Sequence, residues 1–471
     1  MLMYMPVVLY APALALSEVT GIRIWTAVLS TGLVCTFYTS IGGIKAVVWT
    51  DFFQALMMYG SILIIVVKGT IDLGGFDVVW QRNFEGERIE FWRFDFDPTV
   101  RHTFWSLVFG GYITWMGNYA ANQSLIQKYL TISSLRGAQR CLWFNLPALI
   151  LLTCITSMSG IVIYAYYFEC DPIGAKMIQA PDQLFPRFVM ETLGAFPGIP
   201  GLFVAGIFSG ALSTVSSGVN SLAAVMLEDI IKKFIVKDIS GLWATRISKA
   251  LAMSFGVISI VLVFVAEQMG GVLQAALTIH GIVGGPMLGA FTLGMFIPFA
   301  NTWGASTGLV SGFGIAMWFG MGSFASHPYH PEASLSYQAC AELYYNATSI
   351  DIANMSSIPE IIRNNDDIFP PYRLSYLWMS GVGFAVVMIV GVVVSLITRS
   401  KEEIVDERLL SPLITWLSKC MPGGKFKEMV LHKETWGMSQ APLRTTSVIS
   451  DSDFYPTKKA SISYISDSKL S

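Results

Sequence analysis

The sequence is poor in charged residues. Only 13% of its 471 residues are Asp, Glu, Lys or Arg, about half of the ~25% that is typical of soluble proteins. Hydrophobic residues make up 53%, and the mean hydropathy is +0.56. This composition excludes a soluble multidomain enzyme and indicates a protein of the lipid bilayer. The formal net charge is −2 and no basic patch is interleaved with aromatic residues, so no nucleic-acid partner is expected.

Enzyme and metal-site motifs are missing as well. The six cysteines show no CxxC or Cys/His spacing, so no zinc or redox centre is expected. Cys170 and Cys340 lie in loops predicted on the same oxidising side, where they either pair or remain thiols. HExxH, P-loop and GxSxG signatures are absent, so we expect neither an enzyme nor an organic cofactor. The apolar start lacks a basic flank and a cleavage site, and no signal peptide is expected.

Long hydrophobic runs dominate what is present. A run of roughly 18 to 27 residues can cross a bilayer as a helix. Ten such spans are predicted, near residues 1–17, 24–41, 47–68, 104–122, 141–167, 199–227, 248–267, 272–297, 304–323 and 374–397. Residues 1–398 thus form a predicted all-helical transmembrane domain. Residues 399–471 are rich in Ser, Lys, Glu and Asp and are predicted to be a disordered tail.

The distribution of basic residues predicts the orientation. The segment from Lys128 to Arg140 carries basic residues and no acid, which places it in the cytoplasm. Alternation of the spans then puts the 324–372 loop outside and the tail inside, in a plasma membrane. Two N-glycosylation sequons in that loop, usable only on an outer face, begin at Asn346 and Asn354.

The sixth span carries a stripe of small and hydroxylated residues, SGALSTVSSGVNSLAAV. Its members recur at the i, i+3, i+4 spacing of one helix face. The hydroxyls of Ser213 and Thr214 share that face with the carbonyl of Gly210 and the hydroxyl of Ser217. Neutral oxygens suit a small hard cation such as Na⁺. Small residues also let membrane helices approach closely, and the stripe alone leaves both interpretations open.

A charged residue follows a double glycine in YTSIGGIKAVVWTDFFQ. The glycines predict a break between two spans, and Asp51 opens the second. An intramembrane carboxylate is costly, which favours a role in cation passage. A second interpretation makes Asp51 a helix N-cap, with Thr50 as the alternative cap. A salt bridge between Asp51 and Lys45, acting as a cytoplasmic gate, is a further alternative.

The fourth span is interrupted by glycines. Transporters bind substrate where a helix is broken, so the aromatic and amide groups here are predicted to face substrate. Glycines also serve close packing. A second candidate break is Gly284-Gly285-Pro286 beside His280, which has no assigned role. The predicted substrate-facing residues are Gly111, Trp115, Asn118, Asn122 and Gln123.

At these motifs the chain resembles the sodium/solute symporter family, in its branch of multivitamin, monocarboxylate and iodide carriers. The likeness covers about residues 1–325 and includes GGIKAVVWTDFFQ, NQSLIQKYL, APDQLFPRFVMETLGAFPGIPGLF, SGALSTVSSGVNSLAAVMLED and GGPMLGAFTLGMFIP. The resemblance implies a LeuT-like core of five-plus-five inverted-repeat helices. It also implies a sodium site at Ser213 and Thr214 with the Gly210 carbonyl, sodium handling by Asp51, and substrate contact by Trp115 and Asn118.

The resemblance predicts sodium-coupled uptake of a small organic anion, such as a vitamin carboxylate or a short monocarboxylate. Family members begin with about three further spans, including a broken first core helix that completes the sodium shell. We therefore expect weak or absent transport by the chain as written. The alternative is a non-transporting relative that acts as a sensor, an uncoupled ion pathway or a dimer partner.

Overall fold

The computed structural model describes residues 1–173, 175, 177–178, 180–237, 239–267, 271–326, 328–329, 367–398, 409–414 and 416, without the side chains of 44–46. The chain divides into two units, Met1–Lys401 and Glu402–Ser471, and the helices considered below belong to the first. The predicted glycosylation residues Asn346 and Asn354 lie outside the described residues, as does almost all of the predicted tail.

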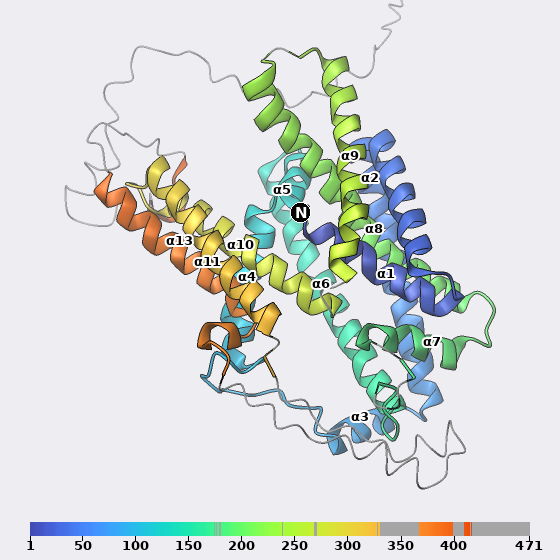
Figure 1. The fold of residues 1–471 in the computed structure, drawn as a ribbon. Coiled ribbons are helices and arrows are strands. Elements are labelled where there is room, and N and C mark those ends of the chain that lie inside the picture. Colours follow the sequence, from blue (N-terminus) through green and yellow to red (C-terminus); the bar gives the residue numbers. More distant parts are fainter. Residues whose placement is uncertain are drawn as a thin grey trace, which may run out of the picture. The chain divides into compact units, whose positions relative to one another are not determined.

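The first unit is built from helices, and its described residues contain no β-strand (Figure 1). In chain order the elements are α1 (Tyr4–Thr20), α2 (Ile24–Asp72), α3 (Phe76–Glu85), η1 (Ser106–Gly110), α4 (Gly111–Met116), η2 (Gly117–Ala121), α5 (Gln123–Leu130), α6 (Leu135–Tyr166), η3 (Pro181–Gln183), α7 (Leu184–Leu193), α8 (Ile199–Val225), η4 (Met226–Ile235), α9 (Gly241–Glu267), α10 (Val272–Phe296), α11 (Thr302–Ser326), η6 (Pro370–Arg373) and α13 (Trp378–Ile397).

The predicted spans agree with these helices. Within the described residues, 8 segments are long and apolar enough to cross a membrane: Ile24–Gly43, Val47–Asp72, Leu135–Tyr166, Ile199–Ile235, Gly241–Glu267, Val272–Phe296, Thr302–Ser326 and Trp378–Ile397. The span predicted at 1–17 corresponds to α1, a shorter apolar helix of 17 residues. The span predicted at 104–122 is irregular.

The double glycine divides α2, as predicted. Gly43 has φ 58° and ψ −162°, in the left-handed region that glycine adopts without the steric cost of a Cβ. This residue separates the first apolar half of α2 from the second, which begins at Val47. Asp51 therefore lies inside the second half, beyond its first turn.

The irregular span contains two π-helical turns, η1 and η2, on either side of α4. Two of its glycines allow close approach of other helices. A Cβ on Gly110 would lie 2.6 Å from the Leu377 carbonyl oxygen, and one on Gly117 would lie 2.9 Å from that of Gly284. Both glycines thus serve packing. Wider i→i+5 turns are common at functional sites. The substrate-facing role of this segment stays a prediction beside its packing role.

Two hydrophobic clusters hold α8 in place. Near its N-terminal half, Phe203 packs with Phe188 of α7, Val162 of α6 and Ile65 of α2, each less than 2% exposed. Near its C-terminal half, buried side chains of α1, the first half of α2, α8 and α9 form a second cluster, which includes Leu9, Val28, Val219 and Val263. Val215 and Val219 of this second cluster alternate along α8 with the members of the hydroxyl stripe, which fixes the orientation of the stripe.

Helices α10, α11 and α13 pack closely together (Figure 1). A Cβ on Gly308 of α11 would lie 2.9 Å from the Val387 carbonyl oxygen of α13, a distance that only glycine permits. The predicted break at Gly284-Gly285-Pro286 is wrong, because α10 is continuous through Pro286. The reason is packing: Gly285 lets the backbone of Ser380 approach, and proline is tolerated in membrane helices.

Candidate functional site

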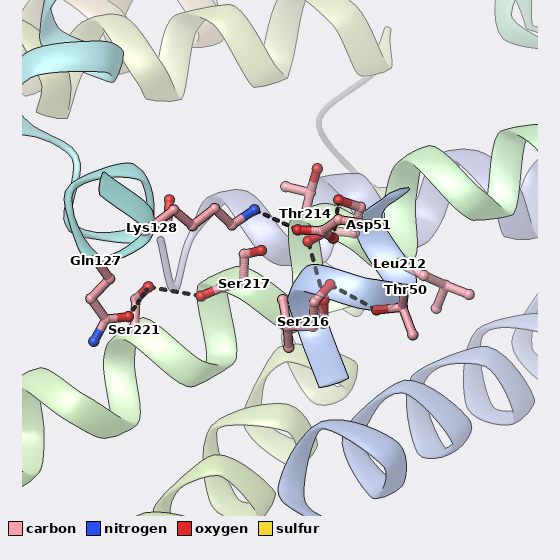
Figure 2. A network of polar contacts seen from close by, with 12 residues as sticks. Thr50, Asp51, Gln127, Lys128, Leu212, Thr214, Ser216, Ser217 and Ser221 are labelled. Atoms are coloured by element: carbon pink, nitrogen blue, oxygen red, sulfur yellow. Dashed lines mark hydrogen bonds and ion pairs between the residues drawn. The ribbon is translucent and has the colours of Figure 1, made fainter. Parts of the chain in front are cut away.

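The hydroxyl stripe of α8 faces a carboxylate. Ser213, Ser217 and Ser221 follow one another at i+4, so they lie on one side of the helix. Ser213 Oγ donates a hydrogen bond of 2.5 Å to Asp51 Oδ1. Asp51 lies 162 positions earlier in the chain, on the second half of α2. Figure 2 shows how Asp51 meets the α8 stripe.

Asp51 is held by side chains of two other helices. Its second oxygen, Oδ2, lies 2.6 Å from Lys128 Nζ of α5 in an ion pair whose side chains are 29% (Lys128) and 19% (Asp51) exposed. The interpretation of Asp51 as a helix cap is wrong, because its carboxylate bonds to α8 and α5. Thr50 also caps nothing, since its hydroxyl donates to the Val47 carbonyl oxygen. The side chain of Lys45, the predicted partner, lies outside the described residues.

The sequence did not identify Lys128 as part of this site. Its neighbour Gln127 accepts a 3.2 Å hydrogen bond from Ser221 Oγ, which ties α5 to α8 about two turns farther along the stripe (Figure 2). Between the two contacts lies Ser217, which is 8% exposed and whose Oγ has no hydrogen-bond partner among the described residues. The basic cluster from Lys128 to Arg140 was used only to predict orientation. The signal that could have identified Lys128 was its position, six residues after the end of the interrupted span at 104–122.

The predicted sodium ligands lie beside Asp51. Thr214 Oγ1 donates to the Gly210 carbonyl oxygen at 3.2 Å, so these two oxygens share one helix turn as predicted. Ser216 is fully buried and donates to the Ser213 carbonyl oxygen at 3.2 Å. On the neighbouring side, Tyr38 Oη donates to the Leu212 carbonyl oxygen at 3.3 Å. The first half of α2 therefore also holds this turn of α8.

The predicted substrate-facing residues lie along the irregular fourth span and at its C-terminal end. Trp115 is 55% exposed, which leaves its ring available for stacking. Asn122 Nδ2 donates to Asn118 Oδ1 at 2.8 Å, and Asn122 Oδ1 accepts from the backbone N–H of Ser124 at 3.1 Å. Asn122 is thus the N-cap of α5. Gln123 is exposed and Gly111 half-buried. Within the described ranges, no hydrogen bond or ion pair joins these side chains to Asp51.

A cavity of about 430 Å³ lies elsewhere, where α6 ends near η3 and α7. It is lined by aromatic rings and by Asp171 and Asp182, and none of the predicted site residues lines it. Close by, Cys170 is disulfide-bonded. Cys340, for which the sequence left pairing with Cys170 open, lies outside the described residues.

The chemistry of the Asp51 site suits a hard cation. It brings together one carboxylate, the hydroxyls of Ser213 and Thr214 and the carbonyl of Gly210, and all of these donors are oxygens. Such ligands favour alkali and alkaline-earth ions over soft metals. The buried Ser217 hydroxyl, which has no partner among the described residues, offers a further oxygen one turn away. These residues fit a site for a monovalent cation.

Comparison with known proteins gives the family. The model of the sodium:solute symporter family matches residues 1–312. The chain is 41% identical over 435 residues to sodium-coupled monocarboxylate transporter 2 of Danio rerio, covering 91% of this chain and 68% of that protein. It is 39% identical over 442 residues to sodium-coupled monocarboxylate transporter 1 of Homo sapiens, covering 92% and 72%.

The chain belongs to the sodium:solute symporter family. A protein of Drosophila melanogaster named "Putative sodium-dependent multivitamin transporter" is 40% identical over 395 residues, with 82% of this chain and 64% of that protein covered. A solved Na⁺-coupled sialic acid symporter in a substrate-bound outward-open state has a TM-score of 0.59 at 20% identity, covering 85% of this chain and 73% of that one. The predicted family and the predicted LeuT-like fold are confirmed, and the symporter family is one of multi-pass membrane transporters.

Proposed function

We propose that this symporter couples the entry of Na⁺ to the uptake of a small organic anion, either a short monocarboxylate or a vitamin carboxylate. The relatives that carry monocarboxylates and vitamins support this substrate class. We also propose that residues 1–398 form the transport domain, that it lies in the plasma membrane and that residues 399–471 are a disordered cytoplasmic tail. The orientation rests on the basic residues around Lys128 and on the sequons at Asn346 and Asn354.

The observation that carries the proposal is the meeting of Asp51 with the hydroxyl stripe of α8. A carboxylate that is only 19% exposed in a helix of membrane-spanning length needs a compensating charge. A cation that crosses the membrane at this point can supply that charge, and the carboxylate stabilises the cation in turn. In this proposal Asp51 supplies the charge, and Ser213, Thr214 and Gly210 supply neutral oxygens that replace water.

Reversibility follows from this ligand set. A single carboxylate that has a lysine as its alternative partner can take up a monovalent ion and release it again, as a carrier requires. In the proposed cycle, Na⁺ at the α8 stripe favours an outward-open arrangement, and the anion then docks near Trp115 and Asn118 before the helices rock inward. Breaks at Gly43 and in the fourth span provide the points at which helices can change direction.

The driving force is adequate for concentrative uptake. Each Na⁺ that enters down a potential of about 100 mV contributes roughly 2.3 kcal/mol, and a monoanion that enters with it costs the same amount. With two Na⁺ per monoanion the net contribution of the potential is therefore roughly 2.3 kcal/mol, which corresponds to about fiftyfold accumulation. Two Na⁺ with one monoanion would carry a net inward charge, so uptake would also generate a current.

The test is uptake of radiolabelled lactate, pantothenate and biotin by cells that express the chain, in sodium and in choline medium. Sodium-dependent uptake of one of them is the expected result. Sodium-independent flux would contradict the symport mechanism. Surface expression without any flux would favour the alternative of a non-transporting sensor or dimer partner.

A further inference from the structure

We propose that Lys128 is a tethered competitor of the transported cation at Asp51. Its ammonium group holds the carboxylate while the cation is away and is displaced when the cation binds. This inference rests on the proposed function, because it requires that Asp51 meets Na⁺ during the cycle. It assigns a positioning and coupling role to a residue that the sequence pattern marked only as a cytoplasmic charge.

The two carboxylate oxygens of Asp51 have different partners, one neutral and one charged. Oδ1 accepts the neutral Ser213 hydroxyl at 2.5 Å, and Oδ2 faces the Lys128 ammonium at 2.6 Å. A hydroxyl can turn its lone pairs toward a cation and remain in place as a ligand. An ammonium group has three donors and no acceptor, and its charge repels any second cation at the same carboxylate. Lys128 therefore excludes Na⁺ from Asp51 unless it moves.

The surroundings allow that movement. Lys128 carries its charge on a flexible four-carbon stem and is 29% exposed, so its ammonium can withdraw toward water without leaving a buried charge. Asp51, in contrast, is fixed within α2. The unpartnered Ser217 hydroxyl is 8% exposed and lies one helix turn beyond Ser213, where it can complete the oxygen shell after the lysine leaves.

Release of Lys128 also links the ion to the predicted substrate region. Helix α5 is only 8 residues long, and it is joined to α2 and α8 by the Lys128–Asp51 and Gln127–Ser221 contacts. The same helix begins at its cap, Asn122, which bonds to Asn118. When Na⁺ displaces the lysine, one of these two contacts is lost. The position of Asn118 and Asn122 then depends on whether the cation is bound.

The first experiment measures ²²Na⁺ binding to the purified 471-residue chain and to two variants. Lys128→Met removes the competing charge, so we expect Na⁺ to bind more tightly, on the order of tenfold. Lys128→Arg keeps the charge and should bind no more tightly than the parent chain. The matched control is Lys232→Met, because Lys232 forms an i,i+4 ion pair with Glu228 on the surface and its loss changes the net charge equally. Equal Na⁺ affinity in Lys128→Met and the parent chain would overturn the proposal.

The second experiment separates this role from a merely structural one. Thermal unfolding is followed in NaCl and in choline chloride. Because Lys128→Met leaves Asp51 without its cation, the variant should unfold at a lower temperature in choline and recover more strongly in Na⁺ than the parent chain does. An equal drop in the unfolding temperature of Lys128→Met in both salts would mean that Lys128 only stabilises the fold, and it would refute the competition between Lys128 and Na⁺.

A third variant distinguishes the two proposals. If Asp51→Asn binds ²²Na⁺ as tightly as the parent chain, Asp51 has no part in sodium binding and the proposed site itself is wrong. If Asp51→Asn binds weakly while Lys128→Met behaves like the parent chain, the sodium site stands and only the competitor role of Lys128 is wrong.

Discussion

Replacing Asp51 by Asn tests the centre of the proposed cation site with the smallest change of shape. The amide keeps an oxygen for the Ser213 hydroxyl, but it loses the charge and replaces the oxygen that faces Lys128 by an NH2 donor. The carboxylate makes two short contacts, 2.5 Å to Ser213 Oγ and 2.6 Å to Lys128 Nζ. Hydrogen bonds to charged groups contribute about 1.5–3 kcal/mol. We expect the substitution to weaken sodium binding by a similar free energy, which is about 10- to 150-fold.

The assay is the sodium activation curve of anion uptake, with surface expression measured in parallel. Asp72→Asn is the matched control, because Asp72 lies on the same helix and pairs with Lys68 at i,i+4 on a more exposed surface. The half-saturating sodium concentration should rise for Asp51→Asn and stay within about twofold of the parent value for Asp72→Asn, as surface pairs contribute little. Equal curves for both variants would refute the role of Asp51.

Three further substitutions test other features. Thr214→Ala should raise the half-saturating sodium concentration by about fivefold, for a lost interaction of ~1 kcal/mol, whereas Thr153→Ala, which removes a similar i−4 hydrogen bond on an exposed face, should leave it unchanged. Gly308→Ala should lower the free energy of unfolding by about 1–3 kcal/mol through overpacking, while Gly314→Ala, whose Cβ would meet nothing within 4 Å, should not. Asn122→Ala should speed hydrogen exchange in α5 by removing a cap worth about 1 kcal/mol, and Asn122→Asp should not.

Much of the fold could be predicted from the sequence because membrane helices are local features. A run of apolar residues and a double glycine determine where a helix begins, ends or breaks, and the break at Gly43 has the left-handed geometry that only glycine adopts readily. The same local reasoning failed at Pro286. There Gly285, beside the proline, serves the approach of Ser380 of α13, a contact that depends on a helix almost a hundred residues later in the chain.

The candidate site was only half predictable. The stripe on α8 and the unusual Asp51 were each evident, since periodicity and an intramembrane charge are properties of single segments. Their contact joins residues 162 positions apart, and the sequence contains no signal for which face of α2 turns toward α8. Lys128 was missed for the same reason. Among several basic residues in a loop region, only the folded chain distinguishes the one that reaches a carboxylate 77 positions away.

The tight seam between α11 and α13 has a consequence for how water and solute can cross. Backbones that touch at Gly308 and Gly312 leave no room for a hydrated ion or for a lipid tail between the two helices. Any aqueous path must therefore avoid this seam, whereas α2, α5 and α8 present hydroxyl, amide and carboxylate groups around Asp51. A drug or label attached to the outer faces of α11 and α13 should accordingly leave permeation untouched.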